Sequence, residues 1–517
     1  MRLISSIALI CLPAATLAGP TFTNVAPALR IHHQYTGGWE HFVGGGVATF
    51  DCNADLLPDL FVAGGDSPAA LLINTSTRGG DVSFTENTPD LLQMTGMVGA
   101  YPLDIDSDGI LDLFVMRVSE NHIFKGGPDC SFTAFSDLNF SVGNHWTTAF
   151  SATWEGANLL PTLAIGNYVD RNDPDGPFEA CDTSFLVRPD GQSYGPALRL
   201  EPSFCPLSML FSDWGRLGRQ DLRVSNDRHY YVRGGGEQLW AMEDTPRLYD
   251  TTDGWRDFSI WGMGIASRDI SGDGIPEVFL TSMADQKLQN LAAGAAGPSF
   301  DDATYDRGTT AHRPYTGGDG RPSTGWHVAF GDVNNDGLDD VFIAKGNVEQ
   351  MPASAMDDPN NLLMQTTDGR FVEAGEMAGI ATMDRSRGGA LVDLNLDGLL
   401  DIVVVNRRAD LEILENISDE SGNWILLEIS QNGTNPQAVG AWIELQNADK
   451  TWHREITVGG GHASGRAGFE HFGLGSVDTV QLRVIWPDGT TSDWLEVSSN
   501  QILRIKKNNT GLTANPL

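Results

Sequence analysis

The sequence predicts an all-β protein, a seven-bladed β-propeller followed by a smaller C-terminal β module. One observation is a nine-residue pattern with oxygen-bearing side chains at positions 1, 3, 5 and 9. It occurs five times, as DCNADLLPD from Asp51, DIDSDGILD from Asp104, DISGDGIPE from Asp269, DVNNDGLDD from Asp332 and DLNLDGLLD from Asp393. A second observation is that each copy runs directly into a short β-branched or aromatic run, which is typical of a buried strand. These runs are LFV from Leu60, LFV from Leu113, VFL from Val278, VFI from Val341 and IVVV from Ile402.

The spacing of the copies is the third observation. Two degenerate copies, WEGANLLPT from Trp154 and DWGRLGRQD from Asp213, fill the long gap between the second and third complete patterns. Successive copies then lie 50 to 63 residues apart. A period of roughly 40–60 residues with several short strands is typical of a propeller blade. Seven such units predict a propeller over residues 19–415.

Two further features predict where the strands of each blade lie. Gly/Ala-rich stretches precede the loops, as in GGGVATF from Gly44, GMGIAS from Gly262 and GGALV from Gly388. Small residues suit an innermost strand, where neighbouring blades crowd around the axis. An F-x-(D/E) signature that predicts an outer strand begins at Phe84, Phe300 and Phe371, and a similar Phe22-Thr-Asn lies near the start of the chain.

Each complete pattern is interpreted as a calcium loop, because Ca²⁺ prefers six to eight oxygen ligands. An EF-hand is excluded because the second and fourth copies have Val115 and Ile343 where a bidentate Glu is required. We expect about five structural ions, rather than a calcium sensor, and none at the two degenerate copies. The expected ligands, with a backbone carbonyl at position 7, are Asp51, Asn53, Asp55, Leu57 and Asp59; Asp104, Asp106, Asp108, Ile110 and Asp112; Asp269, Ser271, Asp273, Ile275 and Glu277; Asp332, Asn334, Asp336, Leu338 and Asp340; and Asp393, Asn395, Asp397, Leu399 and Asp401. The first loop lacks the Gly at position 6.

Residues 1–18 read as a secretory signal peptide, with an apolar run from Leu3 to Leu12 and small residues at Thr16 and Ala18. The mature protein is therefore expected to be secreted, either extracellular or periplasmic. It keeps four cysteines, an even number that suggests two disulfides in an oxidising compartment. Of the three connectivities we favour Cys181–Cys205 with Cys52–Cys130; four buried free thiols are the alternative.

The chain is strongly acidic, with 33 basic and 68 acidic residues and a formal net charge of −35. This charge opposes binding to nucleic acids and to anionic membranes through general electrostatics. After the signal peptide no apolar run reaches the roughly 18 residues that a membrane span needs.

From residue 416 the repeat stops, and alternating strands and Gly turns predict a β module over residues 416–507, with a tail at 508–517. The quoted pattern is NW from Asn423, GA from Gly440, GGGHASG from Gly459, HFGLG from His471 and WPDG from Trp486. It resembles the ASPIC/UnbV domain, and the upstream copies resemble the FG-GAP/VCBS repeats of integrin-α-type propellers. Together they resemble the cartilage acidic protein 1 family and its bacterial exported members. This resemblance implies an extracellular calcium-binding propeller linked to adhesion or matrix-like interactions, without a settled activity.

No HExxH, GxSxG or Walker pattern is present. Gly459–Gly465 favours a turn or packing element over a dinucleotide loop, and His453, His462 and His471 are either a metal or ligand site or ordinary hydrogen-bonded histidines. We therefore expect a non-catalytic binding or adhesion scaffold for an extracellular protein or glycan. The alternative is an enzyme or enzyme auxiliary, such as a propeller-type lyase, that uses one mouth of the channel.

A candidate docking face lies at the end of the propeller opposite the calcium loops. Residues that enter the inner strands crowd this mouth, and Trp and Arg dominate binding hot spots. The candidates are Trp39, His41, His145, Trp146, Trp261, Trp326, His327, Arg385 and Arg387. In the alternative interpretation the tryptophans only wedge between blades.

Overall fold

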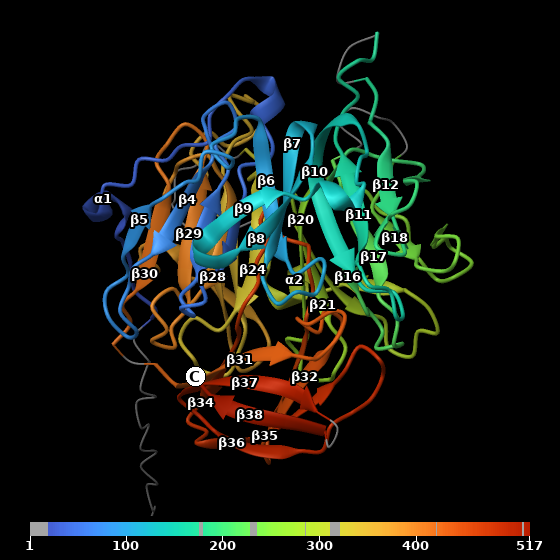
Figure 1. Ribbon diagram of the computed structural model, residues 1–517. Helices are drawn as coiled ribbons and strands as arrows, with labels where there is room; N and C mark the ends of the chain where they lie inside the picture. The colour runs from blue at the N-terminus through green and yellow to red at the C-terminus, as the bar shows by residue number, and fades with distance from the viewer. Residues whose placement is uncertain are drawn as a thin grey trace, which may run out of the picture.

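The computed structural model describes residues 19–174, 179–227, 235–284, 286–310, 321–419, 421–508 and 511–517. The expected signal peptide, residues 1–18, lies outside these ranges. Regular structure is almost entirely β-strand (Figure 1). The described helices are single turns: α1 (Ala26–Leu29), α2 (Thr304–Arg307), α3 (Gly375–Ala378), and the 3₁₀ turns η1 (Trp39–His41), η2 (Pro128–Cys130) and η3 (Ser136–Leu138). None of the described helices is long and apolar enough to cross a membrane.

The N-terminal part of the chain forms successive four-stranded antiparallel units. Three of them contain β2 (Val47–Phe50), β3 (Asp59–Val62), β4 (Ala70–Asn74) and β5 (Phe84–Glu86); β6 (Met97–Leu103), β7 (Asp112–Glu120), β8 (His122–Gly127) and β9 (Ser131–Ala134); and β10 (Asn144–Thr153), β11 (Thr162–Asn167), β12 (Ser184–Val187) and β15 (Leu198–Leu200). The long strands β7 and β10 also pair with each other, which joins the second and third of these units into one sheet. A small hairpin of β13 (Pro189–Asp190) and β14 (Ser193–Tyr194) projects from the third.

The following units have the same strand order. They contain β16 (Pro206–Ser212), β17 (Asp221–Asn226), β18 (Gln238–Ala241) and β19 (Arg247–Leu248); β20 (Gly262–Arg268), β21 (Glu277–Ser282), β22 (Lys287–Leu291) and β23 (Phe300–Asp302); β24 (Gly325–Gly331), β25 (Asp340–Lys345), β26 (Asn361–Gln365) and β27 (Phe371–Glu373); and β28 (Ser386–Val392), β29 (Asp401–Asn406), β30 (Glu412–Asn416) and β1 (Phe22–Asn24). The last unit therefore takes its fourth strand from the opposite end of the chain.

The first strand of each unit packs beside the first strand of the next, in the order β2, β6, β10, β16, β20, β24 and β28, and β28 packs beside β2. These strands are the Gly/Ala-rich stretches that the sequence places innermost. The four F-x-(D/E)-like segments are β1, β5, β23 and β27, each at the outer edge of its unit, as expected. Both predictions of strand position are confirmed.

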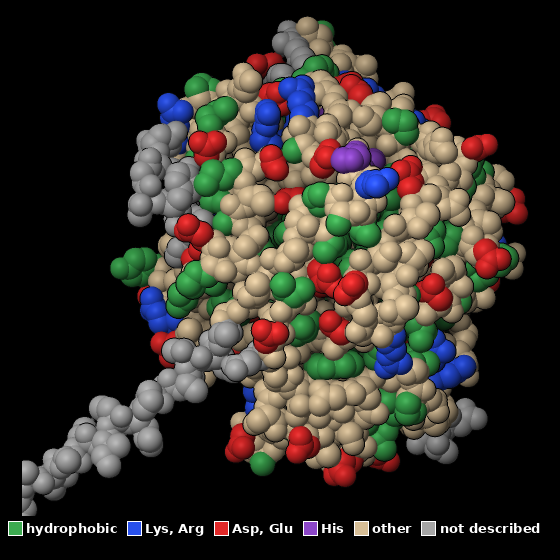
Figure 2. All heavy atoms as spheres, turned by 90° about the vertical axis from the view of Figure 1, so that its left-hand side faces the viewer, with side chains coloured by type: hydrophobic (Ala, Val, Ile, Leu, Met, Phe, Trp, Pro, Cys, Tyr) green, Lys and Arg blue, Asp and Glu red, His purple; other side chains and the backbone are tan. Residues whose placement is uncertain are grey.

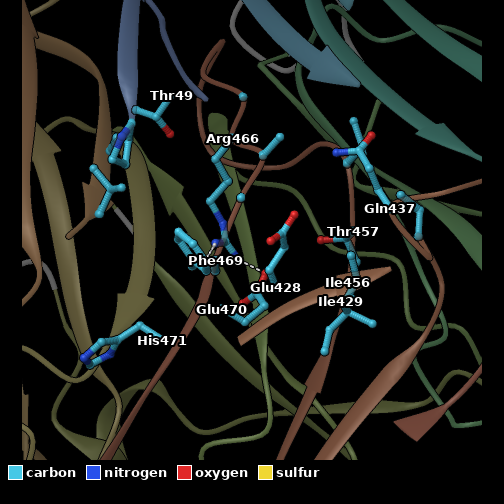
Figure 3. Close-up of a pocket in the computed structure, with 18 of the residues that line it drawn as sticks. Thr49, Glu428, Ile429, Gln437, Ile456, Thr457, Arg466, Phe469, Glu470 and His471 are labelled. Atoms are coloured by element: carbon cyan, nitrogen blue, oxygen red, sulfur yellow. Dashed lines mark hydrogen bonds and ion pairs between the residues drawn. The ribbon is translucent and has the colours of Figure 1, made fainter. Parts of the chain in front are cut away.

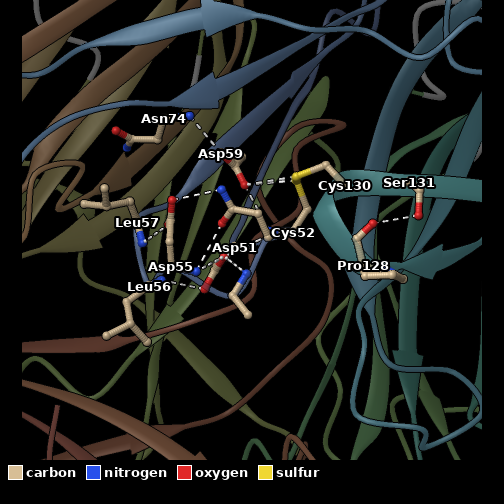
Figure 4. The surroundings of a disulfide bond; sticks show 12 residues. Asp51, Cys52, Asp55, Leu56, Leu57, Asp59, Asn74, Pro128, Cys130 and Ser131 are labelled. Atoms are coloured by element: carbon tan, nitrogen blue, oxygen red, sulfur yellow. Dashed lines mark hydrogen bonds between the residues drawn. A yellow bond between two sulfur atoms is a disulfide. The ribbon is translucent and has the colours of Figure 1, made fainter.

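All five acidic loops connect the first and second strands of a unit, as predicted, and so do the two degenerate copies. Both predicted disulfides are also present. Cys181–Cys205 closes a 24-residue separation, and Cys52–Cys130 joins the first acidic loop to the turn before β9 (Figure 4). The alternative of four free thiols is excluded.

The C-terminal module lies below the repeated units in Figure 1 and consists of two four-stranded sheets. One contains β31 (Asn423–Ser430), β34 (Glu470–Gly475), β37 (Gln501–Asn508) and β38 (Gly511–Pro516); the other contains β32 (Trp442–Gln446), β33 (Thr451–Glu455), β35 (Thr479–Ile485) and β36 (Leu495–Ser498). One apolar cluster, which includes Ile425, Ile443 and Leu482, draws on both sheets. Residues 508–517, expected to be a tail, instead supply β38, which pairs along β37.

Residues 456–469, here named the connecting segment, leave β33, pass among the first strands of the repeated units and return to β34. Backbone hydrogen bonds run from Gly460 to Met209 and from Gly461 to Ile265, both 2.7 Å, and from Gly465 to Ala100 at 3.0 Å. The segment forms isolated β-bridges to β2, β6, β10, β16 and β20. The C-terminal module is thus anchored inside the body that it adjoins.

Glycines make this passage possible. Gly459, Gly460 and Gly461 all have positive φ, a conformation that residues with a Cβ rarely adopt. On the facing strands, a Cβ at Gly46 or Gly99 would lie 1.8 or 1.9 Å from the carbonyl oxygen of Ala463. The small residues of the inner strands therefore make room for the connecting segment, besides relieving contact between units.

We expect Gly99→Ala to destabilise the protein by about 1–3 kcal/mol, because the new methyl group overlaps a backbone oxygen that cannot move freely. Urea denaturation followed by tryptophan fluorescence measures the change. Gly38→Ala is the matched control, since a Cβ there would have no heavy atom within 4 Å. Equal effects of the two substitutions would contradict this account of the inner glycines.

Candidate functional site

The five acidic loops share one hydrogen-bonding scheme. The position-1 carboxylate accepts the backbone N–H of position 6 at 2.6–2.8 Å in every loop. The position-5 carboxylate accepts the N–H of position 7. The position-9 carboxylate accepts the N–H of position 2. The carboxylates at positions 1, 5 and 9 are thus held at one turn in each loop by backbone hydrogen bonds.

The first loop reaches this geometry without glycine at position 6. Leu56 has φ +77°, close to the values of 89–92° at Gly109, Gly274, Gly337 and Gly398. This left-handed conformation costs a residue with a side chain roughly 1–2 kcal/mol. Leu56 packs against a small apolar cluster that contains Leu396 and Leu426, and the Cys52–Cys130 disulfide holds the same loop.

Position 3 separates the second loop from the others. In three loops an Asn amide at this position donates to the position-5 carboxylate: Asn53 to Asp55, Asn334 to Asp336 and Asn395 to Asp397. In the third loop Ser271 donates to Asp269. The second loop has Asp106, which has no proton to donate. The ammonium of Lys125 bridges Asp106 and Asp108 instead, 2.8 Å from the Asp108 carboxylate.

Burial of the carboxylates disfavours their charged form. It raises the pKa of Asp104 to about 6, of Asp59, Asp112 and Glu277 to about 7, and of Asp393 to about 8. The pKa values of Asp332, Asp340 and Asp401 lie well above the usual range for the same reason, reinforced by neighbouring carboxylates. Such groups remain ionised when a bound cation supplies the missing positive charge.

In both degenerate loops an acid pairs with an arginine. Asp221 accepts from Arg219 at 2.8 Å, from Trp214 and from Tyr249. Glu155 forms an ion pair with Arg188 at 2.7 Å.

The C-terminal module docks directly on the acidic loops. His453 binds Asp269 at 2.7 Å, and Trp452 donates to the carbonyl of Gly337 at 3.1 Å. Arg454 pairs with Asp339 at 2.9 Å. Gln437 accepts the N–H of Asp104 at 2.8 Å. The acidic loops therefore form the surface that contacts the C-terminal module.

The three C-terminal histidines do not gather at one point. His453 contacts the third acidic loop, and His471 hydrogen-bonds to the Gly398 carbonyl of the fifth. His462 lies in the connecting segment, where it bonds to the Met263 carbonyl and accepts the N–H of Gly44. The alternative of ordinary hydrogen-bonded histidines therefore holds.

Most of the predicted docking face is buried. His41, Trp146, Trp326, His327 and Arg387 have at most 5% of their surface exposed. The Arg387 guanidinium stacks on Trp326 and donates to the carbonyl of Phe42. Trp39, His145, Trp261 and Arg385 are half-buried. Trp146 and Trp326 therefore pack inside the body, and Trp326 and Arg387 cannot contact a partner without rearrangement.

A cavity of about 700 Å³ lies between the inner strands and the C-terminal module (Figure 3). Thr49, Gln437, Thr457 and Glu428 line it, and the Arg466–Glu470 ion pair belongs to its wall. Sequence reasoning missed this cavity because it depends on how the module sits below the units. The run of three glycines from Gly459 was the one local signal that the backbone passes through a narrow space.

Two family models match the chain. The model described as ASPIC and UnbV matches residues 431–511, and the model of the FG-GAP-like repeat matches residues 51–115. Cartilage acidic protein 1 of Mus musculus is 24% identical over 485 residues, which is 86% of this chain and 70% of the mouse protein. The chain carries an FG-GAP-like repeat and an ASPIC/UnbV domain, and is distantly related to cartilage acidic protein 1.

Cartilage acidic protein 1 of Xenopus tropicalis is 31% identical over a shorter stretch of 127 residues, which is 23% of this chain and 20% of the Xenopus protein. Among solved structures, BBS1N in complex with ARL6DN has 9% identity and a TM-score of 0.43, and the match covers 73% of this chain and 94% of that chain.

We expect acid to lower the free energy of unfolding through His462, which lies in the connecting segment. Burial lowers the pKa of His462 to about 4, below the ordinary value of 6.5. The unfolded chain therefore takes up a proton between pH 6.5 and 4 that the folded chain excludes, and stability falls as the pH drops through this window. The largest loss of stability from this one histidine is on the order of 3 kcal/mol.

His462→Gln tests this expectation, because glutamine offers a donor and an acceptor but does not titrate. Urea denaturation of both proteins at pH 7 and pH 4.5 should show a larger loss for the wild type. Parallel losses in the two proteins would mean that His462 does not contribute to the acid sensitivity.

Proposed function

We propose that this protein is an extracellular, calcium-stabilised seven-bladed β-propeller that serves as a non-catalytic binding scaffold for an extracellular protein or glycan. The single observation that carries the proposal is the common geometry of the five acidic loops, which orient buried carboxylates at equivalent places beneath one docked module. The four-stranded units, the contact between β28 and β2, and the pairing of β1 with β30 support a closed ring of seven blades.

Location outside the cytoplasm is supported by the two disulfides, which persist in oxidising compartments. The expected signal peptide and the names of both curated relatives, which refer to cartilage, agree with it. Acidic side chains are scattered over the face shown in Figure 2, in keeping with the net charge of −35. Such a surface favours solubility and disfavours polyanionic partners.

Binding of Ca²⁺ would involve the side chains at positions 1, 3, 5 and 9 of each acidic loop, with the position-7 carbonyl. The residues fit this ion because they offer hard oxygen ligands, many of them buried carboxylates. The ion would supply positive charge and cross-link each loop. It would also fix the surface on which the C-terminal module rests, so that the propeller and module present one rigid surface to a partner.

A screen of residues 19–517 against arrayed glycans and extracellular matrix proteins, with calcium and with chelator, tests the function. We expect saturable binding to a protein or glycan that is lost when calcium is removed. Turnover of an arrayed glycan or protein, rather than retention of the protein on it, would favour the enzyme class instead.

Calcium should raise the melting temperature strongly, because ions that bind only the folded form stabilise it by mass action. Asp336→Ala should lower the number of bound ions by one, since it removes position 5 of a complete loop. Asp213→Ala is the matched control and should leave that number unchanged. Calorimetric titration and elemental analysis give the counts. A melting temperature that is equal in chelator and in millimolar calcium would contradict the proposal.

Lys125 should compete with calcium in the second loop, because its ammonium occupies the space between two expected ligands. Lys125→Met should therefore increase the calcium affinity of this loop about tenfold or more, as four carboxylates then face the ion without an internal cation. The double variant Asp106→Asn/Lys125→Met restores the Asn pattern of the other loops and serves as the control. Weaker calcium binding by Lys125→Met would show that the lysine supports the site.

A further inference from the structure

The cavity between the propeller-like body and the C-terminal module contains one arginine without a partner. Four arginines line this cavity. Three form ion pairs: Arg454 with Asp339 at 2.9 Å, Arg504 with Glu428 at 2.7 Å, and Arg466 with Glu470. The fourth, Arg268, is the last residue of β20, and its side chain forms no ion pair or hydrogen bond with any described residue. Its Nε and Nη1 atoms are buried without a hydrogen-bond partner.

An unpartnered guanidinium of this kind is costly. A buried donor left without an acceptor costs about 1–3 kcal/mol, and more when it is charged. Asp339 and Glu470 lie near enough for Arg268 to help lower their pKa values, but each is already paired, with Arg454 and Arg466 respectively. The cavity therefore keeps one positive charge that its own wall does not neutralise, and an anion would complete it.

Among the remaining acids on the wall, Asp129 is exposed on the turn before β9, and the others are engaged elsewhere. Asp51, Asp104, Asp269 and Asp393 line the cavity, and each is position 1 of an acidic loop. Under the proposed function each of these carboxylates binds a calcium ion, so this inference rests on the proposed function. Glu455 accepts hydrogen bonds from the backbone N–H of Asp213, the Ser212 hydroxyl and the Gln220 amide. Burial raises the pKa of Glu455 to about 7.

Another part of the cavity wall is apolar. Val328 of β24 and Ala390 and Leu391 of β28 line the cavity on the first strands that follow β20 around the body. A volume of about 700 Å³ lies within the range of roughly 300–1,000 Å³ that is usual for small-molecule sites. We propose that this cavity binds a small organic acid, with its carboxylate on Arg268 and its carbon skeleton against β24 and β28.

Calorimetric titration of residues 19–517 in millimolar calcium tests the proposal, with 2-naphthoate and its uncharged amide, 2-naphthamide, as probes. The two have nearly the same shape, so a difference between them reports the carboxylate. We expect 2-naphthoate to bind about tenfold or more tightly than the amide, since charge-assisted hydrogen bonds are the stronger ones. Arg268→Gln should abolish this difference, and Arg268→Lys should keep part of it.

Arg504→Gln is the matched control, because Arg504 lines the same cavity but is paired with Glu428. It should preserve the preference for the carboxylate. Equal affinity for the two probes, an unchanged preference in Arg268→Gln, or no binding of 2-naphthoate at millimolar concentration would overturn the proposal. Melting curves of each variant with and without chelator, in the same buffer, show separately whether the fold and the calcium response are intact. A failure of calcium binding is thereby distinguished from a failure of the acid site.

Discussion

The passage of the connecting segment among the inner strands is the constraint on which the rest of the structure depends. Its backbone hydrogen bonds join units that are far apart in the sequence, and the three consecutive glycines from Gly459 adopt φ values that other residues avoid. The inner strands keep glycine at Gly46 and Gly99 because the Ala463 carbonyl fills the space of a side chain. The same segment holds the C-terminal module against the acidic loops and forms part of the cavity wall.

Local features of the sequence were sufficient to predict the strands and loops. The repeated DxDxDG-like pattern marks a tight turn between two buried strands, and every copy lies where such a turn is needed. Phe22 is recognisable as the start of an outer strand because the same signature occurs at Phe84, Phe300 and Phe371. The disulfide pairing could be chosen because Cys181–Cys205 closes a short loop between the third and fourth units, which leaves Cys52 and Cys130 as the second pair. These features depend on short-range chemistry, which a single sequence records.

Long-range packing could not be predicted in the same way. Trp146, Trp326 and Arg387 have the composition of a binding hot spot, but they fill the end of the channel, where a guanidinium stacked on an indole is an internal support. Lys125 lies outside the loop whose carboxylates it contacts. Only the Asp at position 106, in place of Asn, indicated an additional cation. Arg268 stands next to a predicted ligand, yet its lack of a partner depends on ion pairs formed by the C-terminal module.

The pairing of β1 with β30 has a consequence for how the chain reaches this state. Strand β1 pairs with a strand that is synthesised nearly 400 residues later, Phe22 with Asn416. The connecting segment is synthesised later still, and it enters the body between β33 and β34. Contacts of such long sequence separation slow folding, because chain entropy is lost before they form. Until the C-terminal part of the chain has been synthesised, the body therefore lacks these contacts, and its edge strands and acidic loops are accessible to chaperones and proteases.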